Sequence, residues 1–450
     1  MRSVFLILAL FSVVITVCAP APEMVRDVET LPQENIRYLD GGRPDSLLVP
    51  QTLQNRFNHR ADSLFFLPWH WNRDRALFET LRGLFEAFKK NPGWGENLRK
   101  RDAAWIEALE GNADLGSFPN TGEPGITTAN SDLRMLPTNK PVFRDYRLAG
   151  EGFPFDYLET SSIPANTPVR IIQTAKDKSW VWVRSCIAVG WLPARDVASV
   201  DSAFIRRWEA GNPVVIVQDD IPITSQTGLF LFHAPLGMVF PKTGEDSSSI
   251  RFLVAMPGVD RKAVIAEAVL PKTQAADKPL DLTPMNLARM ADRLIREPYG
   301  WGGMYQNRDC SATIRDLFIP FGILLPRNGN HQAEEGFGAV DLGMLDPAEK
   351  EKTVIQKGIP FLTLLWFKGH IMLYIGHERG RALAFHNLWG IRTRTRSGEE
   401  GRYIVGEAVV TTLSPGKGLR RADPDGDLLR RIQKMVFVVP LDSVLRPATH

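Results

Sequence analysis

Residues 309–321 read DCSATIRDLFIPF and follow the turn sequence YGWGG at 299–303. Apolar residues recur from Ala312 to Phe321 with helical spacing, which predicts a helix whose first turn contains Cys310. That turn carries unpaired backbone N–H groups and the positive end of the helix dipole, and both favour negative charge. The position therefore predicts a lowered thiol pKa and a nucleophilic Cys310.

Two histidines lie downstream, in GHIMLYIG (369–376) and FHN (385–387). A cysteine with histidines far along the chain is the pattern of a nucleophile whose base is supplied by the fold. We expect His370 to act as the base and His386 to orient its ring, so that Cys310, His370 and His386 form a catalytic triad.

The hairpin that carries both histidines can be placed by counting. Gly376 and Gly380 bracket three residues, which predicts a three-residue loop. Pairing these glycines puts His370 directly opposite His386, on one face and at one edge of the sheet. A helix packed on that face could then present its cysteine to His370. A register shift of one residue would separate the histidines onto opposite faces.

The same three side chains allow a second interpretation. Thiolate and imidazole are ligands that Zn²⁺ accepts, so Cys310, His370 and His386 could hold a metal. The sequence lacks the short ligand pairs common in zinc sites. We therefore expect neither a metal nor an organic cofactor.

The overall composition is that of a globular protein. The chain has 450 residues, of which 44% are apolar and 23% charged, and this length predicts about three domains. The net charge is +3, and acidic and basic residues are interleaved without blocks of one sign. This pattern indicates a solvated surface and argues against a nucleic-acid partner. We expect a monomer without a stable membrane span.

The N-terminus indicates export. Arg2 precedes an uncharged, mostly apolar run at 4–17, and small residues and prolines follow at 19–22. This is the pattern of a secretory signal peptide, with an apolar run too short to span a membrane. We expect a periplasmic or cell-envelope location. Lipidation of Cys18 is an alternative, which Val17 disfavours because a small residue normally precedes a lipidated cysteine.

Cys186 is the only other cysteine of the predicted mature chain. An exported protein with two cysteines can form a disulfide bond. Pairing would consume the cysteine placed like a nucleophile, so we expect Cys186 to be a buried, small apolar side chain on a strand.

Three zones follow one another along the chain. The N-terminal zone is helical, with helices predicted at 75–90 and 102–111 after a polar, extended tract at 25–60. Short β-type runs bounded by turn residues at 121–275 predict two successive small barrels. Residues 283–450 place helices first and antiparallel strands after them, which is an α+β pattern.

The sequence at these residues resembles the NlpC/p60 family of papain-like cell-wall peptidases. The matching stretches are PYGWGG (298–303), DCS (309–311), LPR (325–327) with Gln332, and GHIMLYIG (369–376). Upstream, FFLPWH (65–70) and WGEN (94–97) resemble the helical stabilising region of multi-domain bacterial members, and SDLR (131–134), FDYL (155–158) and GW (190–191) resemble the first of two bacterial SH3-like barrels.

The resemblance implies a multi-domain fold that ends in an α+β papain-like catalytic domain. Its parts are a signal peptide at 1–21, a helical stabilising region at 22–120, SH3-like barrels at 121–198 and 199–282, and the catalytic domain at 283–450.

The implied activity is that of a γ-D-glutamyl-L-diamino acid endopeptidase acting on peptidoglycan stem peptides. The family pattern places the nucleophile on Cys310, the base on His370 and the third polar residue on His386. A wall-binding protein with an inert peptidase fold, or a cysteine-dependent acyltransferase, are the alternatives. The sequence does not distinguish diaminopimelate from lysine substrates.

The resemblance also implies substrate contacts. Tyr299 matches a tyrosine near the catalytic cysteine, and Asp309 and Ser311 match residues that contact substrate. In relatives the first barrel narrows the cleft, so that peptides with a free N-terminal L-Ala fit and a carboxylate of the barrel pairs with the amine. Glu151 and Asp156 are both candidates for that carboxylate.

Overall fold

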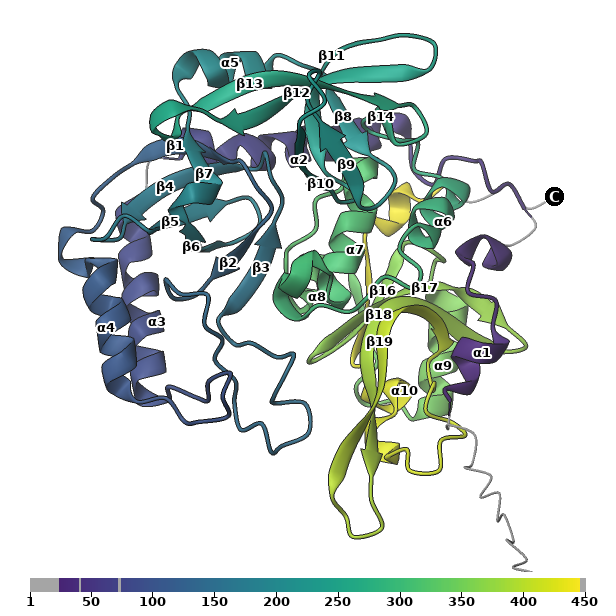
Figure 1. Cartoon of the computed structure of the whole chain (residues 1–450). Coiled ribbons are helices and arrows are strands. Elements are labelled where there is room, and N and C mark those ends of the chain that lie inside the picture. Colours follow the sequence, from purple (N-terminus) through teal and green to yellow (C-terminus); the bar gives the residue numbers. More distant parts are fainter. Residues whose placement is uncertain (1–23, 40–41, 72–73, 446–450) are drawn as a thin grey trace, which may run out of the picture.

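The computed structural model describes residues 24–39, 42–71 and 74–445 (Figure 1). They form a helical N-terminal region, two small β domains and a C-terminal α+β domain, which is the predicted fold class. The predicted signal peptide at 1–21, with Cys18, lies outside the described residues. Within the described ranges, no helix combines the length and the apolar character that a bilayer crossing requires.

The N-terminal region supports the first barrel with a helix pair. Its α-helices are α1 (Arg26–Thr30), α2 (Gln51–His70), α3 (Phe78–Lys90) and α4 (Ala103–Ala113). The Asp102 carboxylate caps α4 by accepting a hydrogen bond from Trp105 N at 2.9 Å. α3 and α4 lie side by side and share an apolar core with the barrel (Figure 1).

The long helix α2 connects the first barrel to the C-terminal domain. Residues 51–60 are helical, which corrects the extended tract predicted over 25–60. Near the end of the helix, Trp69 Nε1 donates a hydrogen bond to Gly125 O at 2.6 Å. Near its start, Gln54 Nε2 donates to Phe321 O at 3.2 Å. The helix thus bonds to both bodies that flank the site described below.

The first barrel contains β1 (Glu123–Thr127), β2 (Ser131–Arg134), β3 (Glu159–Ile163), β4 (Pro168–Thr174), β5 (Trp180–Ser185), β6 (Val189–Pro193) and β7 (Val197–Ser199). The strand order is β3-β2-β6-β5-β4-β1-β7. Trp182 pairs with Trp191 across β5 and β6, and both indoles are fully buried. β3 is left at the end of the sheet, where it meets the C-terminal domain.

The second barrel follows the helix α5 (Ser202–Glu209). Its strands are β8 (Pro213–Ile216), β9 (Ile221–Thr224), β10 (Phe230–Ala234), β11 (Val239–Glu245), β12 (Ser249–Pro257), β13 (Ala263–Pro271) and β14 (Ala275–Asp277). Stacked or tilted pairs among Phe232, Phe240 and Phe252 form its core.

The C-terminal domain is an antiparallel sheet with helices on both faces. Its helices are α6 (Pro284–Asp292), α7 (Cys310–Phe318), α8 (Gly329–Glu334), α9 (Pro347–Lys357) and α10 (Leu428–Arg431). Its strands are β15 (Ala339–Asp341), β16 (Thr363–Phe367), β17 (His370–Glu378), β18 (Arg381–Arg394), β19 (Glu400–Thr412) and β20 (Lys434–Phe437), in the order β15-β20-β16-β17-β18-β19.

Side chains along β17 point alternately to the two faces of the sheet, which determines the helices that each side chain contacts. Ile371 and Leu373 belong to the core that α7 shares with the sheet. Met372 and Tyr374 belong to a separate core that includes residues of α9 and α10. Because successive side chains point to opposite faces, the His370 side chain belongs to the α9–α10 face. The expectation that the cysteine helix packs on the histidine face is therefore wrong.

The β17–β18 hairpin also differs from the predicted register. Glu378 pairs with Arg381 around a two-residue turn, instead of the predicted three-residue loop. An irregularity at Ile375 then shifts the pairing, so that Tyr374 pairs with Ala384. The shorter turn alone would place the two histidines on opposite faces of the sheet. The extra residue returns them to the same face. The two histidines share one face, as expected, but they are diagonal neighbours two residues out of register.

Candidate functional site

The N-terminus of α7 is held by a carboxylate cap. Asp309 Oδ1 accepts hydrogen bonds from Ser311 N at 3.1 Å and Ala312 N at 2.9 Å. Cys310 is the first residue of the helix, as predicted, and is half-buried. Among the described residues, none accepts a hydrogen bond from the backbone N–H of Cys310. The cap thus satisfies two of the free N–H groups at the helix start and leaves one beside the thiol.

Cys310 opens onto a cleft of about 890 Å³ between the first barrel, α2 and the C-terminal domain. The predicted site residues that line it are Tyr299, Asp309, Cys310, Ser311 and His370. The backbone N–H of Ile371 acts to lower the pKa of the Cys310 thiol, which indicates that the sulfur lies near the first residues of β17. The thiol therefore lies near the N-terminal end of β17, where His370 is also located.

His386 lies behind His370 and is fully buried. His370 Nε2 and His386 Nδ1 are 2.7 Å apart, and His386 Nε2 lies 3.0 Å from Thr411 Oγ1. Because these facing ring nitrogens bond to each other, the zinc interpretation is not favoured. Within the described ranges, no three His, Cys, Asp or Glu side chains gather as a metal site.

The hydrogen-bond partners assign the tautomers of both rings. The Thr411 hydroxyl donates its single proton to Thr412 O at 2.7 Å, so it accepts from His386 Nε2–H. Neutral His386 then accepts at Nδ1, and His370 donates through Nε2–H. The remaining nitrogen of His370, Nδ1, is the unprotonated one. This arrangement leaves a free imidazole lone pair for proton transfer at the cleft.

Burial sets the protonation states of the resting site. It raises the pKa of Cys310 to about 12, with a further increase from the Asp309 carboxylate, while the Ile371 N–H acts in the opposite direction. The thiol pKa is therefore raised rather than lowered as predicted, because desolvation and the Asp309 charge both disfavour the thiolate. Burial lowers the pKa of His370 to about 3, and the Arg431 charge lowers it further. The resting pair is a neutral thiol and a neutral imidazole.

Arg327 joins the nucleophile helix to the first barrel. Its Nη2 donates to Asp309 Oδ2 at 2.8 Å, and its Nε donates to Ser161 Oγ on β3 at 2.7 Å. Gln332 Nε2 donates to Ser311 O at 2.9 Å. Both side chains occur in matching stretches of the sequence, but their contacts depend on packing between distant segments and were not predicted.

Tyr299 and the turn after it form the wall between the cleft and β3. Burial raises the pKa of the Tyr299 phenol, and the ring packs against Trp389. Gly302 and Gly303 have φ values of 63° and 102°, in the region that favours glycine. A side chain at Gly303 would overlap Ser162 on β3. These glycines therefore allow the turn to lie directly on the barrel.

Neither predicted barrel carboxylate lines the cleft, which corrects both candidates. Asp156 accepts from Val142 N and Leu158 N, each at 2.9 Å, and ion-pairs with Arg134 at 2.7 Å, so its oxygens serve the barrel itself. Glu151 accepts a hydrogen bond from the Tyr157 hydroxyl at 2.9 Å.

Glu159, on β3, is the carboxylate of the first barrel that lines the cleft. Its side chain is 1% exposed, and its Oε2 ion-pairs with Arg134 at 2.5 Å. Its Oε1 has no hydrogen-bond partner among the described residues. Burial raises the pKa of Glu159 to about 9, while the Arg134 charge acts in the opposite direction. The pairing of β2 with β3 positions this residue, and no local sequence signal marks it.

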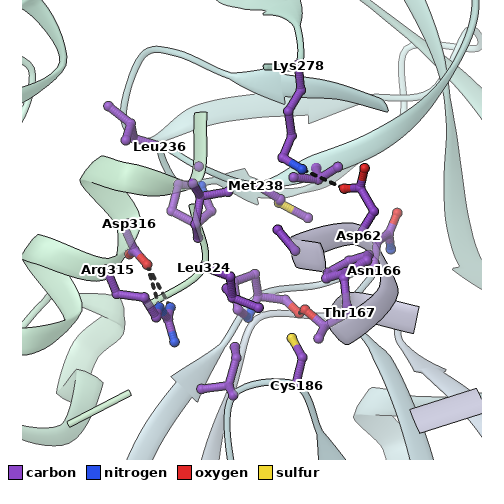
Figure 2. Close-up of a pocket in the computed structure, with 18 of the residues that line it drawn as sticks. Asp62, Asn166, Thr167, Cys186, Leu236, Met238, Lys278, Arg315, Asp316 and Leu324 are labelled. Carbon is purple, nitrogen blue, oxygen red and sulfur yellow. Dashed lines mark hydrogen bonds and ion pairs between the residues drawn. The ribbon is translucent and has the colours of Figure 1, made fainter. Parts of the chain in front are cut away.

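A second cavity lies between α2, the two barrels and α7, as Figure 2 shows. Cys186 faces it from the turn after β5, rather than from a strand as predicted. Cys186 and Cys310 are both free thiols. Burial raises the pKa of Cys186 to about 11, which makes it a poor nucleophile.

Comparison with protein families matches four segments of the chain. Residues 3–118 match the NLPC_P60 stabilising domain, residues 141–193 an SH3 domain of the SH3b1 type, residues 201–247 an SH3 domain of the SH3b2 type, and residues 296–399 the NlpC/P60 family. The matched segments follow the order of the helical region, the two barrels and the C-terminal domain.

The solved structures that are similar to the chain include the following two. One is described as a novel NlpC/P60 endopeptidase from Photobacterium damselae subsp. piscicida; it is 23% identical with a TM-score of 0.81, and the match covers 91% of this chain and 97% of that one. A Bacillus cereus NlpC/P60 family protein is 17% identical with a TM-score of 0.46, over 70% and 100% of the two chains. The first likeness shows a shared fold, and the second is too low to add to it. No curated protein matches the chain.

Proposed function

This protein is a multi-domain member of the NlpC/P60 family, and we propose that it is a cysteine endopeptidase that hydrolyses the γ-D-glutamyl-L-diamino acid bond of peptidoglycan stem peptides. One observation carries the proposal. The chain Thr411, His386 and His370 leaves an unprotonated imidazole nitrogen in the cleft that also contains Cys310. A neutral base beside a neutral thiol at a helix start is suited to acyl transfer through a thioester.

The proposed reaction begins with proton transfer. The Cys310 S–H proton moves to His370 Nδ1 as the sulfur attacks the carbonyl carbon of the γ-glutamyl amide. The free N–H of Cys310 stabilises the oxyanion. The imidazolium then protonates the departing amine, the C–N bond breaks, and a thioester remains. His370 next takes a proton from water as the water oxygen attacks the thioester. The C–S bond breaks, the imidazolium returns the proton to the departing sulfur, and a carboxylic acid and the Cys310 thiol result.

Asp309 and Ser311 support this chemistry in different ways. The Asp309 carboxylate is held by Arg327, which lowers its pKa, and it keeps the helix start in place. The Ser311 hydroxyl donates to Asp309 Oδ1 at 2.9 Å. Both residues line the cleft, and we propose that they adjoin the bound γ-glutamyl group.

We further propose that the substrate carries a free N-terminal amine and that Glu159 receives it. The unpartnered Oε1 of Glu159 supports this assignment, because a buried acceptor without a donor is costly and an ammonium would satisfy it. Intact cross-linked wall, in which the L-Ala amine is acylated, would leave Glu159 unsatisfied.

Cleavage of L-Ala-γ-D-Glu-diaminopimelate by the purified protein tests the reaction. We expect hydrolysis that a metal chelator does not inhibit and that Cys310→Ala abolishes. Full cleavage by Cys310→Ala would contradict the mechanism, and inhibition by the chelator would revive a metal site. Intact sacculi, assayed in parallel, should be a much poorer substrate than the free peptide.

Glu159→Gln tests the amine assignment separately. We expect kcat/KM to fall roughly 10- to 100-fold for the free-amine peptide and to change little for its N-acetylated form, which is already a poor substrate. Glu151→Gln is the matched control, because this carboxylate lies on the same barrel and off the cleft. An equal loss on both peptides would assign Glu159 a structural role only.

A further inference from the structure

A strongly basic hollow lies on the α9–α10 face of the C-terminal domain. It consists of two adjoining depressions of about 280 and 400 Å³. We call these two depressions together the basic hollow. The cationic side chains that line it are Lys350, Lys368, Arg430 and Arg431. Its outer part includes one carboxylate, Asp425. Among the described residues, none of the four cations forms an ion pair with a carboxylate.

The side chains of the basic hollow are held in place by packing and hydrogen bonds. Lys350 is 3% exposed, and its Nζ donates to Arg430 O at 2.7 Å and to Ile432 O at 2.6 Å. These two carbonyls leave one ammonium proton without an acceptor. The Arg431 guanidinium lies over the Phe367 ring, 4.2 Å from its centre. Four cations against one carboxylate in the lining create a positive potential that attracts anions.

The hollow adjoins the catalytic base. Lys368 lines both the hollow and the cleft, and it lies in the tight turn just before His370. The Phe367 ring, whose face carries Arg431, lies 5.7 Å from the His370 ring, centre to centre. Through Lys368 and Phe367, the hollow therefore lies next to His370.

The proposed reaction indicates which part of a substrate lies near the basic hollow. In the proposed reaction His370 returns its proton to the departing amine, so the leaving group lies next to that ring. The acyl part lies towards Glu159 on the first barrel. A leaving diamino acid, or a short peptide that begins with one, carries at least one free carboxylate. That carboxylate is the complementary charge for the hollow.

We propose that the basic hollow is a subsite for the C-terminal carboxylate of the leaving diamino-acid peptide. This inference rests on the proposed function and deepens it. The subsite selects substrates whose leaving part ends in a free acid over those in which it is amidated or extended by a neutral group. Selection by the barrel acts on the amine end, and selection by the hollow acts on the opposite end.

A pair of peptides and a pair of surface substitutions test the subsite. The peptides share L-Ala-γ-D-Glu-diaminopimelyl-D-Ala and end in a carboxylate or a carboxamide. Lys368→Gln with Arg430→Gln changes two exposed side chains and keeps the buried Lys350. We expect kcat/KM to fall about tenfold for the acid and less than about twofold for the amide. Arg396→Gln, an exposed arginine outside the hollow, is the matched control.

Equal effects on both peptides would overturn the subsite while leaving the proposed function intact. If the wild-type protein cleaves neither peptide, the proposed function fails, and binding decides the subsite. Calorimetry with Cys310→Ala then compares free diaminopimelyl-D-Ala with its carboxamide. Acid-selective binding that the double substitution removes would support the subsite. Binding of inorganic phosphate without discrimination between the peptides would assign the hollow to a phosphate-bearing polymer and overturn the proposal.

Discussion

Thr411 is the side chain that ends the hydrogen-bond chain from His370 through His386. It is fully buried, and its hydroxyl proton is committed to Thr412 O, so it acts on His386 only as an acceptor. Thr411→Val keeps the shape and removes this acceptor. His386 can then carry its proton on Nδ1, which forces the proton of His370 onto its own Nδ1. We expect kcat to fall roughly 100-fold with little change in KM.

Nitrogen-15 NMR of the histidine rings tests this positioning role directly. Thr411→Ser retains the hydroxyl and should recover the wild-type tautomers and most of the activity. A Thr411→Val protein with unchanged tautomers and reduced kcat would indicate a packing defect instead.

The pH dependence of kcat/KM reports the state of His370. Burial lowers its pKa to about 3, Arg431 lowers it further, and Asp309 acts in the opposite direction. His370 loses its function as a base when it is protonated, so a lowered pKa extends activity to more acidic pH. We expect the acid limb to lie below pH 5, rather than near the ordinary histidine value of about 6.5. Rates measured from pH 3.5 to 8 check this, and half-loss near pH 6.5 would contradict it.

At the scale of elements, the turn of the β17–β18 hairpin holds the histidine strands together. Arg379 and Gly380 have φ values of 50° and 74°, which suit a tight two-residue turn. A side chain at Gly380 would enter open space, so Gly380→Ala adds only the cost of an unfavourable φ. We expect a loss of about 1 kcal/mol, seen as a lower melting temperature. Gly380→Asn should lose less, because asparagine tolerates this conformation; equal losses would contradict the argument.

The helix start and the shared face of the histidines could be predicted from the sequence, because both follow from short-range periodicity. The residue pairing between β17 and β18 could not be predicted, because the extra residue at Ile375 depends on how the two whole strands fit together. The thiol pKa was also mispredicted, because a helix start is a local feature while desolvation of Cys310 depends on the assembled cleft. Glu159 and Thr411 carry no local signal, and long-range strand pairing alone brings them to the site.

At the scale of the whole molecule, the turn at Gly303 determines how closely the first barrel approaches the C-terminal domain. Gly303→Ala forces the turn away from Ser162, which displaces β3 and its Glu159 from the turn. We expect kcat/KM for free-amine peptides to fall about tenfold. Gly398→Ala is the control, since that glycine also has a positive φ but faces open space. Similar losses in the two variants would show that backbone strain, rather than displacement of the barrel, is responsible.

Arg327 gives the arrangement of domains a thermodynamic consequence. One guanidinium contacts both Asp309 at the nucleophile helix and Ser161 on the barrel, so alignment of the helix and docking of the barrel are linked equilibria. Linkage is reciprocal: whatever favours the docked state favours the aligned helix, and a ligand that fills the cleft strengthens docking by the same free energy. We therefore expect a substrate that fills the cleft to stabilise the docked barrel as well, and product release to weaken that contact.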